Sequence, residues 1–338
     1  MRINQDRRGF LATAAATFAG LELPMLGATK SLLGGLSALR NATAWLNSPP
    51  LTADALRGKV VLVDFCTYTC VNWLRTLPYL RAWDAKYRER GLVVIGAHTP
   101  EFDFEHDLDN VRRAIKAMRV EYPIAVDNEY AIWNGFTNQY WPALYLIDAK
   151  GATRFTHFGE GAYDESERKI QNVLGDLGAK GFTSDLVTVD ARGLEVAADW
   201  GNLRSQENYL GAVRTEGFRA NSDASRLGLN QWTLDGDWQQ SPRAVALHKP
   251  NGRIVYRFHA RDLNLVMGPA ARGASVRFRV RIDGQPEGGG ADVDAQGQGV
   301  VTEQRTYQLI RQARPIEDRQ FEIEFLDPGA EAFCFTFG

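Results

Sequence analysis

Short apolar runs alternate with amphipathic stretches between residues 57 and 182. Continuous apolar runs that are typical of buried strands occur at 60–65, 92–96, 123–127 and 143–148. Apolar spacings of three and four residues predict helices over 74–87, 104–119, 129–135 and 164–178, and a further strand is expected at 153–158. Strands that alternate with helices indicate an α/β sheet, to which the late strand–turn–strand unit adds an antiparallel edge.

A different pattern begins near residue 190 and continues to the end of the chain. Apolar and polar residues alternate at 276–282 and again at 321–325, and Phe333, Phe335 and Phe337 occupy alternate positions. Short alternating strands separated by glycine-rich turns predict an all-β antiparallel sandwich over 190–338. We expect the three phenylalanines to share one face of a strand.

The N-terminal part of the chain shows neither pattern. Residues 1–28 combine a basic start, which includes Arg7 and Arg8, with a short run of small apolar residues, as an export signal does. The paired arginines look like a twin-arginine signal, so we expect a periplasmic or other extracytoplasmic protein. Residues 29–56 include the Ser-Pro-Pro sequence at 48–50 and are expected to form an extended lead-in.

Composition narrows the function further. The 338 residues carry a net charge of −2, which lacks the basic excess that nucleic-acid binding requires. The histidines and cysteines form no group with the spacing of metal ligands, and we expect neither a metal nor a cofactor. An odd number of cysteines, Cys66, Cys70 and Cys334, leaves at least one thiol free or paired between chains. Cys334 lies between two phenylalanines and is expected to be a structural thiol.

The segment 63–73, Val-Asp-Phe-Cys-Thr-Tyr-Thr-Cys-Val-Asn-Trp, carries the candidate chemistry. A buried strand ends in it, and Cys70 falls at the first turn of the next predicted helix. Backbone N–H groups at a helix N-terminus stabilise negative charge. The sequence therefore predicts a lowered pKa for the Cys70 thiol and a nucleophile that is reactive at neutral pH.

These residues resemble the thioredoxin superfamily, in particular its TlpA-like and DipZ-type branches, from about residue 45 to the C-terminus. The resemblance implies a thioredoxin-like fold and an oxidoreductase that acts on thiols or disulfides of exported proteins. Asp64, six residues before Cys70, matches the buried carboxyl that exchanges protons with the thiol. A strand-end aspartate that caps a local turn is the alternative. Trp141 and Pro142 match the cis-proline segment, where an extended substrate pairs with the backbone.

The sequence departs from the usual Cys-x-x-Cys pattern because Trp73 occupies the resolving position. We assign Trp73 to the substrate-binding surface. Cys66 could pair with Cys70 if the strand end bends, or it could simply fill a position where relatives have tryptophan. Without such a pair, Cys70 would act as a monothiol, through mixed disulfides or a sulfenic acid. Its reductant would come from an unidentified electron donor.

Two other functions remain open. The Thr-x-x-Cys sequence that begins at Thr67 resembles the peroxiredoxins, and Arg154 stands where their arginine would follow; together they could polarise a peroxide. The proline of that pattern is absent, since Val63 holds its position. The third hypothesis is a binding protein whose redox chemistry has lapsed through Trp73.

The region from about residue 190 resembles the β-sandwich tail of DipZ-type proteins, on the residues at 258–263 and 307–310. This resemblance implies a jelly-roll similar to carbohydrate-binding modules. Trp232 or Trp238 could stack on a sugar or peptide, with core packing as the alternative. Glu101, which follows the second predicted strand, is either a second acid–base group or a solvated loop carboxylate.

Overall fold

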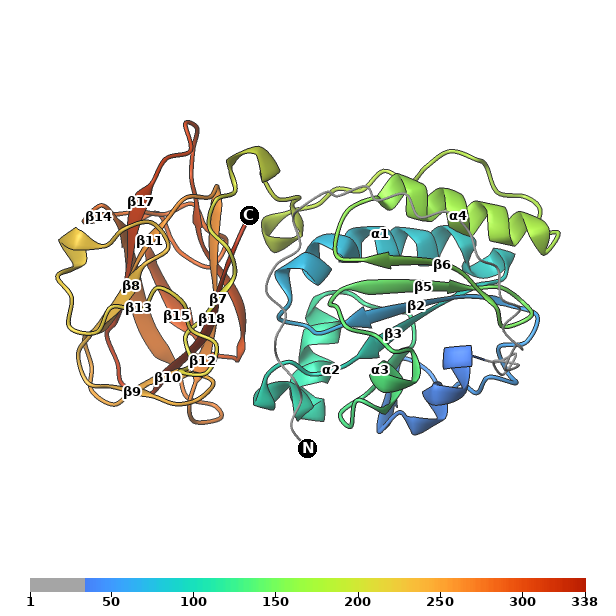
Figure 1. The fold of residues 1–338 in the computed structure, drawn as a ribbon, viewed down its shortest axis with the longest axis horizontal. Helices are drawn as coiled ribbons and strands as arrows, with labels where there is room; N and C mark the ends of the chain where they lie inside the picture. The colour runs from blue at the N-terminus through green and yellow to red at the C-terminus, as the bar shows by residue number, and fades with distance from the viewer. Residues whose placement is uncertain (1–33) are drawn as a thin grey trace, which may run out of the picture. The chain divides into compact units, whose positions relative to one another are not determined.

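A mixed six-stranded sheet forms the first part of the described chain, residues 34–338 of a computed structural model (Figure 1). The strand order is β1-β4-β3-β2-β5-β6, with β2, β3 and β4 parallel and the other strands antiparallel to their neighbours. The strands are β1 (Ala44–Leu46), β2 (Val60–Cys66), β3 (Leu92–His98), β4 (Ile124–Val126), β5 (Ala143–Ile147) and β6 (Thr153–Phe158). The predicted α/β sheet with an antiparallel edge is confirmed. The expected export signal at 1–28 lies outside the described residues.

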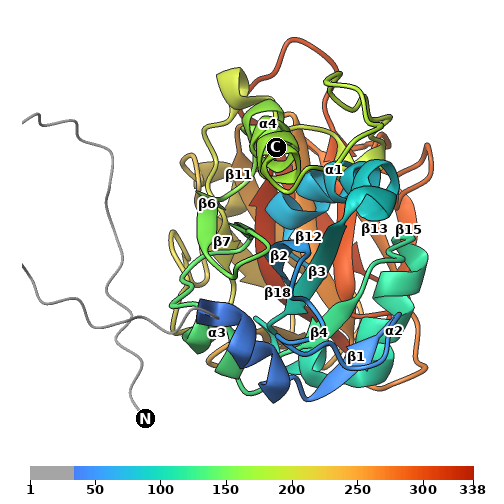
Figure 2. The same cartoon turned by 90° about the vertical axis from the view of Figure 1, so that its right-hand side faces the viewer.

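The segment expected to be an extended lead-in contains regular structure. A 3-10 helix spans Gly34–Asn41, and β1 pairs antiparallel with β4 at the edge of the sheet (Figure 2). Three residues are too few to show a periodic signal in sequence. The expectation for 29–56 is therefore wrong over these residues.

Four α-helices accompany the sheet. They are α1 (Val71–Tyr87), α2 (Leu108–Ala117), α3 (Ala131–Gly135) and α4 (Tyr163–Asp176), with short 3-10 helices at Arg88–Arg90, Asp103–His106, Gly193–Glu195, Trp200–Asn202 and Ala224–Arg226. The helix expected over 104–119 is divided at Asp107, whose side chain accepts hydrogen bonds from the amides of Asp109 and Asn110 and so starts α2. Within residues 34–338, no helix is long and apolar enough to cross a membrane.

Side chains of β2 alternate between the two faces of the sheet. Leu62 and Cys66 join an apolar cluster that includes α1 and α4, whereas Val63 and Phe65 join a second cluster that includes α3. Figure 1 shows α1 and α4 on one side of the strands and α3 on the other. This burial on both faces explains why β2 is almost continuously apolar in sequence.

Two antiparallel sheets form the C-terminal part, as predicted. One has the order β16-β12-β18-β10-β9 with β7 added to β18, and the other has the order β14-β13-β17-β11-β8 with β15 added to β13. The strands are β7 (Asn208–Tyr209), β8 (Trp232–Asp235), β9 (Trp238–Gln240), β10 (Val245–Leu247), β11 (Gly252–Phe258), β12 (Asp262–Pro269), β13 (Val276–Ile282), β14 (Gln285–Pro286), β15 (Gln298–Val301), β16 (Arg305–Arg311), β17 (Arg319–Phe325) and β18 (Ala330–Phe337). The jelly-roll resemblance stays a prediction.

A β-bulge interrupts the pairing of β12 with β18. Val266 lies opposite Cys334, and the next residue, Met267, lies opposite Ala332, so Phe333 has no partner of its own. An extra residue in one strand interrupts the regular alternation of side chains between the two faces of the sheet. The bulge therefore places Phe333 out of step with the rest of β18.

The bulge separates the three phenylalanines that were expected on one face. Phe335 and Phe337 pack inside the sandwich, but Phe333 joins the cluster of the first part of the chain. Its ring lies 4.9 Å from that of Phe104 and 5.5 Å from that of Phe102, measured between centroids. The expectation is wrong for Phe333, and the reason is that the bulge directs its ring toward the first part of the chain.

Candidate active site

Cys70 is the N-cap residue of α1. Its backbone is extended, with φ −71° and ψ 111°, and the helix begins at Val71 as the sequence predicts. A short loop joins the end of β2 to Cys70. Because β5 runs antiparallel to β2, with Phe65 opposite Ala143, the residues that precede β5 lie beside this loop. The half-buried Cys70 thiol donates to the carbonyl oxygen of Trp141, with Sγ and O 3.9 Å apart. The Trp141–Pro142 peptide bond is cis, as the resemblance implies.

The charge state of Cys70 differs from the expectation. Burial raises the pKa of its thiol well above the ordinary value, and the carboxylates of Glu207 and Glu101 raise it further. Hydrogen bonds from the backbone N–H groups of Trp73 and Asn72 lower the pKa of Cys70, as a helix N-terminus should, but they are outweighed. The predicted lowering is therefore wrong: in this structure the free protein holds Cys70 as a thiol.

Asp64 and Trp73 form a buried pair beneath the site. Both residues are 0% exposed, and the indole Nε1 of Trp73 donates to Asp64 Oδ2 at 2.7 Å. Burial raises the pKa of Asp64 to about 7, and the hydrogen bond from Trp73 partly offsets this. The raised pKa expected of this carboxyl is confirmed.

The buried position of Trp73 changes the role expected for it. Its ring belongs to the core cluster, so a substrate bound at the surface does not touch it. An indole N–H that is removed from water needs an acceptor, and Asp64 is the acceptor present. We therefore withdraw Trp73 from the substrate-binding surface and regard it as a residue that holds Asp64.

Cys66 is fully buried at the end of β2. Burial raises the pKa of its thiol well above the ordinary value, and the charges of Asp64 and Cys70 add to that effect. Cys66, Cys70 and Cys334 are all free thiols in the structure. Pairing of Cys66 with Cys70 remains a hypothesis, and Cys66 as it stands is packed in the core.

The loop that precedes Cys70 is fixed by Glu105, which is 0% exposed. Glu105 Oε1 accepts hydrogen bonds from the hydroxyl and the amide of Thr69, at 2.7 and 3.3 Å. Its Oε2 accepts from the amides of Glu101 and Phe102, at 2.7 and 2.9 Å. Nothing in the sequence indicated this role, because Glu105 lies in the stretch 104–119 that was expected to form a single helix. A buried carboxylate with four donors holds two loops together.

The C-terminal part holds the same loop from the other side. The hydroxyl of Thr306 donates to the carbonyl oxygen of Thr69 at 2.7 Å, and the Tyr68 hydroxyl donates to the carbonyl oxygen of Gln304 at 3.3 Å. Thr306 and Thr69 are both buried. The residue before the cysteine is therefore held directly by the sandwich.

Cross-strand neighbours extend this contact into a row. Thr306 lies opposite Val266, Val266 opposite Cys334, and Cys334 opposite Tyr209, on the strands β16, β12, β18 and β7. Residues directly opposite one another project from the same face of a sheet. Val266, Cys334 and Tyr209 join the apolar cluster against which Cys70 packs. Cys334 is 2% exposed, which fits the structural role expected for it.

The structure does not bring the expected peroxide-site residues together. Thr67 is buried just after the end of β2. Arg154 lies beside the opposite end of that strand, because Ile147 pairs with both Val61 and Thr153. The Arg154 guanidinium is paired with carboxylates at the surface. The expected pairing of Thr67 with Arg154 is therefore wrong.

The two tryptophans suggested as stacking residues differ in how far they are buried. Trp232 is 0% exposed, and its Nε1 donates to the carbonyl oxygen of Glu216. Trp238 is half-buried, with its ring 5.8 Å from that of Phe325. Stacking of Trp232 on a sugar or peptide is contradicted by its burial, whereas stacking on Trp238 stays a prediction.

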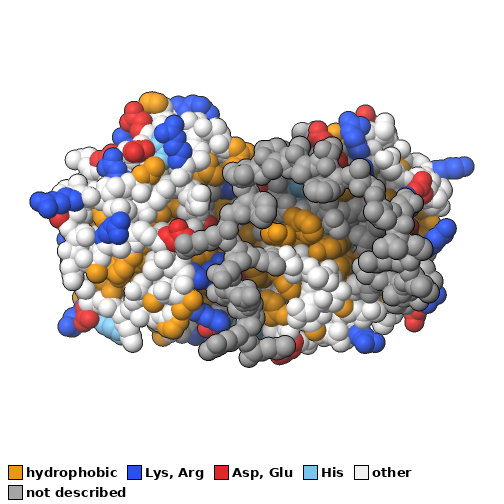
Figure 3. Space-filling model, viewed as in Figure 1, with side chains coloured by type: hydrophobic (Ala, Val, Ile, Leu, Met, Phe, Trp, Pro, Cys, Tyr) orange, Lys and Arg blue, Asp and Glu red, His pale blue; other side chains and the backbone are white. Residues whose placement is uncertain are grey.

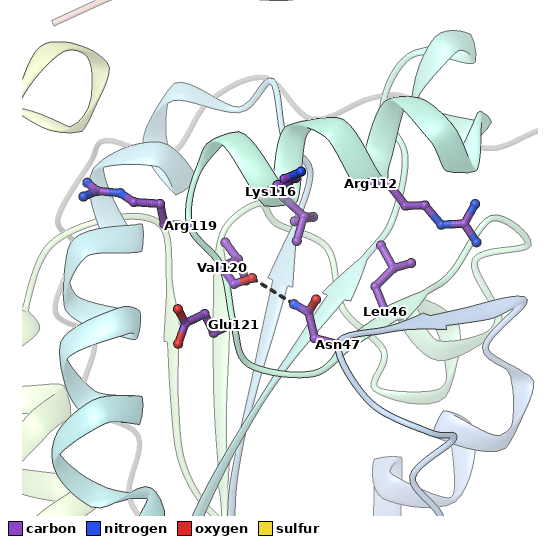
Figure 4. Close-up of a pocket in the computed structure, with 8 residues that line it drawn as sticks. Leu46, Asn47, Arg112, Lys116, Arg119, Val120 and Glu121 are labelled. Atoms are coloured by element: carbon purple, nitrogen blue, oxygen red, sulfur yellow. Dashed lines mark hydrogen bonds between the residues drawn. The ribbon is translucent and has the colours of Figure 1, made fainter.

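One hollow lies away from the cysteines. It has a volume of about 510 Å³ and is lined by residues of β1 and α2 and the segments that follow them (Figure 4). Asn47 bridges its floor by donating to the carbonyl oxygen of Val120 at 2.9 Å.

Basic and acidic side chains are interspersed on the face of the described chain in Figure 3. Among residues 34–338, no three His, Cys, Asp or Glu side chains are grouped so that they could hold a metal.

The strand order, the cysteine at the start of α1 and the adjacent cis-proline are those of a thioredoxin-like α/β fold, with the Cys70 thiol at its site. Residues 205–338 match a family model described as a thioredoxin-like C-terminal domain. Over 312 residues the chain is 34% identical to Protein DipZ of Mycobacterium tuberculosis, which covers 89% of this chain and 42% of DipZ. The chain thus spans less than half the length of that relative.

Two further similarities each cover about two fifths of the chain. Thiol-disulfide oxidoreductase YkuV of Bacillus subtilis is 25% identical over 138 residues, which are 41% of this chain and 93% of YkuV. A solved structure of a thiol-disulfide isomerase from Corynebacterium glutamicum has 24% identity and a TM-score of 0.36, and the match covers 41% of this chain and 94% of that one. The resemblance to thioredoxin-like and DipZ-type proteins is confirmed.

The raised pKa of Cys70 predicts how its alkylation depends on pH. The rate with iodoacetamide should rise about tenfold per pH unit from pH 6 to about pH 8.5 without levelling off, because only the thiolate reacts. Mass spectrometry locates the label, and a Cys70→Ser variant should remain unlabelled while folded, since Cys66 and Cys334 are buried. A plateau at or below about pH 7 would contradict this reading of the site.

Asp64→Asn should stabilise the protein at pH 8 and have little effect at pH 4. The pKa of Asp64 is raised to about 7 in the folded chain, so the folded state loses stability relative to the unfolded chain as pH rises from about 4 to about 7. Asparagine cannot ionise, and its oxygen still accepts from Trp73. The gain in the free energy of unfolding should be on the order of 4 kcal/mol at pH 8, measured with urea. The same substitution at the exposed Asp54, Asp54→Asn, is the control. An equal change in the free energy of unfolding in both variants would contradict the raised pKa of Asp64.

Proposed function

We propose that this protein is an exported thiol–disulfide oxidoreductase that reduces disulfides of exported proteins through Cys70. The observation that carries the proposal is the position of the Cys70 thiol, half-buried at the start of α1 and 3.9 Å from the carbonyl oxygen of Trp141. An extended substrate that paired with the backbone at Trp141 and Pro142 would bring its disulfide to this sulfur. Similarity to YkuV, which is named as a thiol-disulfide oxidoreductase, supports the assignment.

The exchange proceeds in three balanced steps. Cys70 loses its proton and attacks one sulfur of the substrate disulfide; that S–S bond breaks, a mixed disulfide forms, and the second substrate sulfur leaves and takes up a proton. A thiol of the electron donor then attacks the Cys70 sulfur, which releases the first substrate sulfur. A further donor thiol restores free Cys70 and leaves the donor oxidised. Trp73 at the resolving position is why the second step needs a thiol from outside the Cys-x-x-Cys turn.

The raised pKa of Cys70 favours the reducing direction. A strongly oxidising site stabilises its own reduced form as a thiolate, whereas the carboxylates near Cys70 oppose the thiolate. In this proposal Asp64, which lies on β2 with Cys66, takes up and returns the protons that the thiols lose and regain during the exchange. Export through residues 1–28, by the twin-arginine route, would place the protein with disulfide-containing partners.

The test is to trap the mixed disulfide. Wild type and the variants Cys70→Ser, Cys66→Ser and Cys334→Ser are each incubated with insulin, whose disulfides are intact. The samples are then quenched with acid and analysed by mass spectrometry. We expect an adduct at Cys70 in the wild type and in the Cys334→Ser variant, and none in Cys70→Ser. If Cys66 acts as a resolving thiol, the mixed disulfide at Cys70 should accumulate in the Cys66→Ser variant.

Two results would overturn the proposal. Absence of an adduct in the wild type would favour the binding-protein hypothesis, whose ligand binding should be unchanged in Cys70→Ser. A parallel sample with hydrogen peroxide measures sulfenic acid at Cys70. If peroxide were consumed rapidly while insulin gave no adduct, the peroxidase hypothesis would replace the proposal despite the distance of Arg154 from the site.

A further inference from the structure

A buried arginine of α1 forms an ion pair in the interior of the protein. Arg75 is 3% exposed, and its Nη1 lies 2.8 Å from Oε1 of Glu160, in the loop between β6 and α4. The two side chains are only 2% and 7% exposed. A pair so far removed from water is costly to break, because the partner that remains is a buried charge without a counterion. Arg75 and Glu160 therefore hold α1 and this loop together.

The loop that contains Glu160 also holds the segment opposite the thiol. The amide of Gly159 donates to the carbonyl oxygen of Pro142 at 2.9 Å. The residue before Pro142, Trp141, carries the carbonyl oxygen to which the Cys70 thiol donates. Cys70 itself is the N-cap residue of α1, so the ion pair joins the two sides of the site.

The same guanidinium also binds the sandwich. Nη2 of Arg75 donates to the carbonyl oxygen of Phe337, on β18, at 3.0 Å. The donors of a guanidinium lie in one rigid plane, so bonds to two different segments restrict how those segments can move relative to each other. Arg75 thus connects the helix that begins after Cys70, the loop that leads to Pro142, and a strand of the C-terminal part.

We propose that Arg75 is a positioning residue: it sets the gap between Cys70 and the Trp141–Pro142 segment, and so the rate at which the thiol attacks a disulfide held in an extended protein chain. Such a chain must pair with the backbone of that segment while its disulfide meets the sulfur, so the two must lie at a set distance. A small disulfide needs only access to the sulfur. This inference rests on the proposed function, because it concerns the same attack of Cys70 on a disulfide.

The test measures the rates at which Cys70 forms a mixed disulfide with insulin and with 2-hydroxyethyl disulfide, at pH 8, by acid quenching and mass spectrometry. The ratio of the two rates separates positioning from the reactivity of the sulfur. In Arg75→Met we expect this ratio to fall roughly tenfold, because small misplacements of reacting groups are costly. Alkylation of Cys70 by iodoacetamide should stay within about twofold of the wild-type rate. Arg75→Lys, which keeps the charge but not the planar guanidinium, should give an intermediate ratio.

Further variants separate positioning from a loss of folding. Arg75→Met leaves Glu160 as an unpaired buried charge, whereas the double variant Arg75→Met/Glu160→Gln buries no charge there and should show the lowered ratio in a folded protein. Arg81→Met is the matched control. Arg81 also lies on α1 and pairs with a carboxylate, but its partners are Glu195 and the carbonyl oxygen of Met118. Its ratio should equal that of the wild type.

Three results would overturn the inference. One is a wild-type ratio in both Arg75→Met and the double variant, and another is an equal fall of the ratio in Arg81→Met. The third is an equal slowing of both disulfides, which would show that Arg75 affects only the exposure or reactivity of the sulfur. If insulin gave no adduct in the wild type although iodoacetamide labelled Cys70, the proposed function itself would fail.

Discussion

The site depends on the hydrogen bond that Thr306 donates to the carbonyl oxygen of Thr69, the residue immediately before Cys70. Both partners are buried, and Glu105 binds the amide and hydroxyl of Thr69 from the opposite side. These contacts hold Thr69 in one position, because moving it would leave buried polar groups without partners, which is costly. The C-terminal sandwich is therefore a structural component of the cysteine site.

This arrangement explains how the site differs from a Cys-x-x-Cys site. Trp73 fills the resolving position and gives its indole N–H to Asp64, so the buried acid is bound to a core residue. The remaining thiol, Cys70, faces a sandwich that contributes Glu207 to its surroundings. Desolvation and two carboxylates then outweigh the amides of the helix N-terminus. A single thiol in such surroundings suits the donation of electrons to a disulfide more than their removal from a pair of thiols.

The sequence predicts what is local. The position of Cys70 before α1 follows from a buried strand and an amphipathic helix close together in sequence, and the cis bond before Pro142 was implied by the resemblance to the thioredoxin superfamily. The pKa of Cys70 could not be predicted in this way, because Glu207 lies far along the chain and belongs to a different part of the fold. The outward turn of Phe333 depends on a bulge, which alternation in sequence does not reveal.

Amide hydrogen exchange of residues 67–70 tests most directly whether the sandwich builds the cysteine site. The amide of Cys70 donates to the carbonyl oxygen of Thr67 at 3.2 Å and that of Thr69 donates to Glu105, so both are protected while the loop stays in place. In Thr306→Val the loop loses its donor, and the account predicts roughly tenfold faster exchange in this segment. Thr306→Ser, which keeps a hydroxyl, should exchange as the wild type does. Equal protection of the loop in Thr306→Val and wild type would contradict the account.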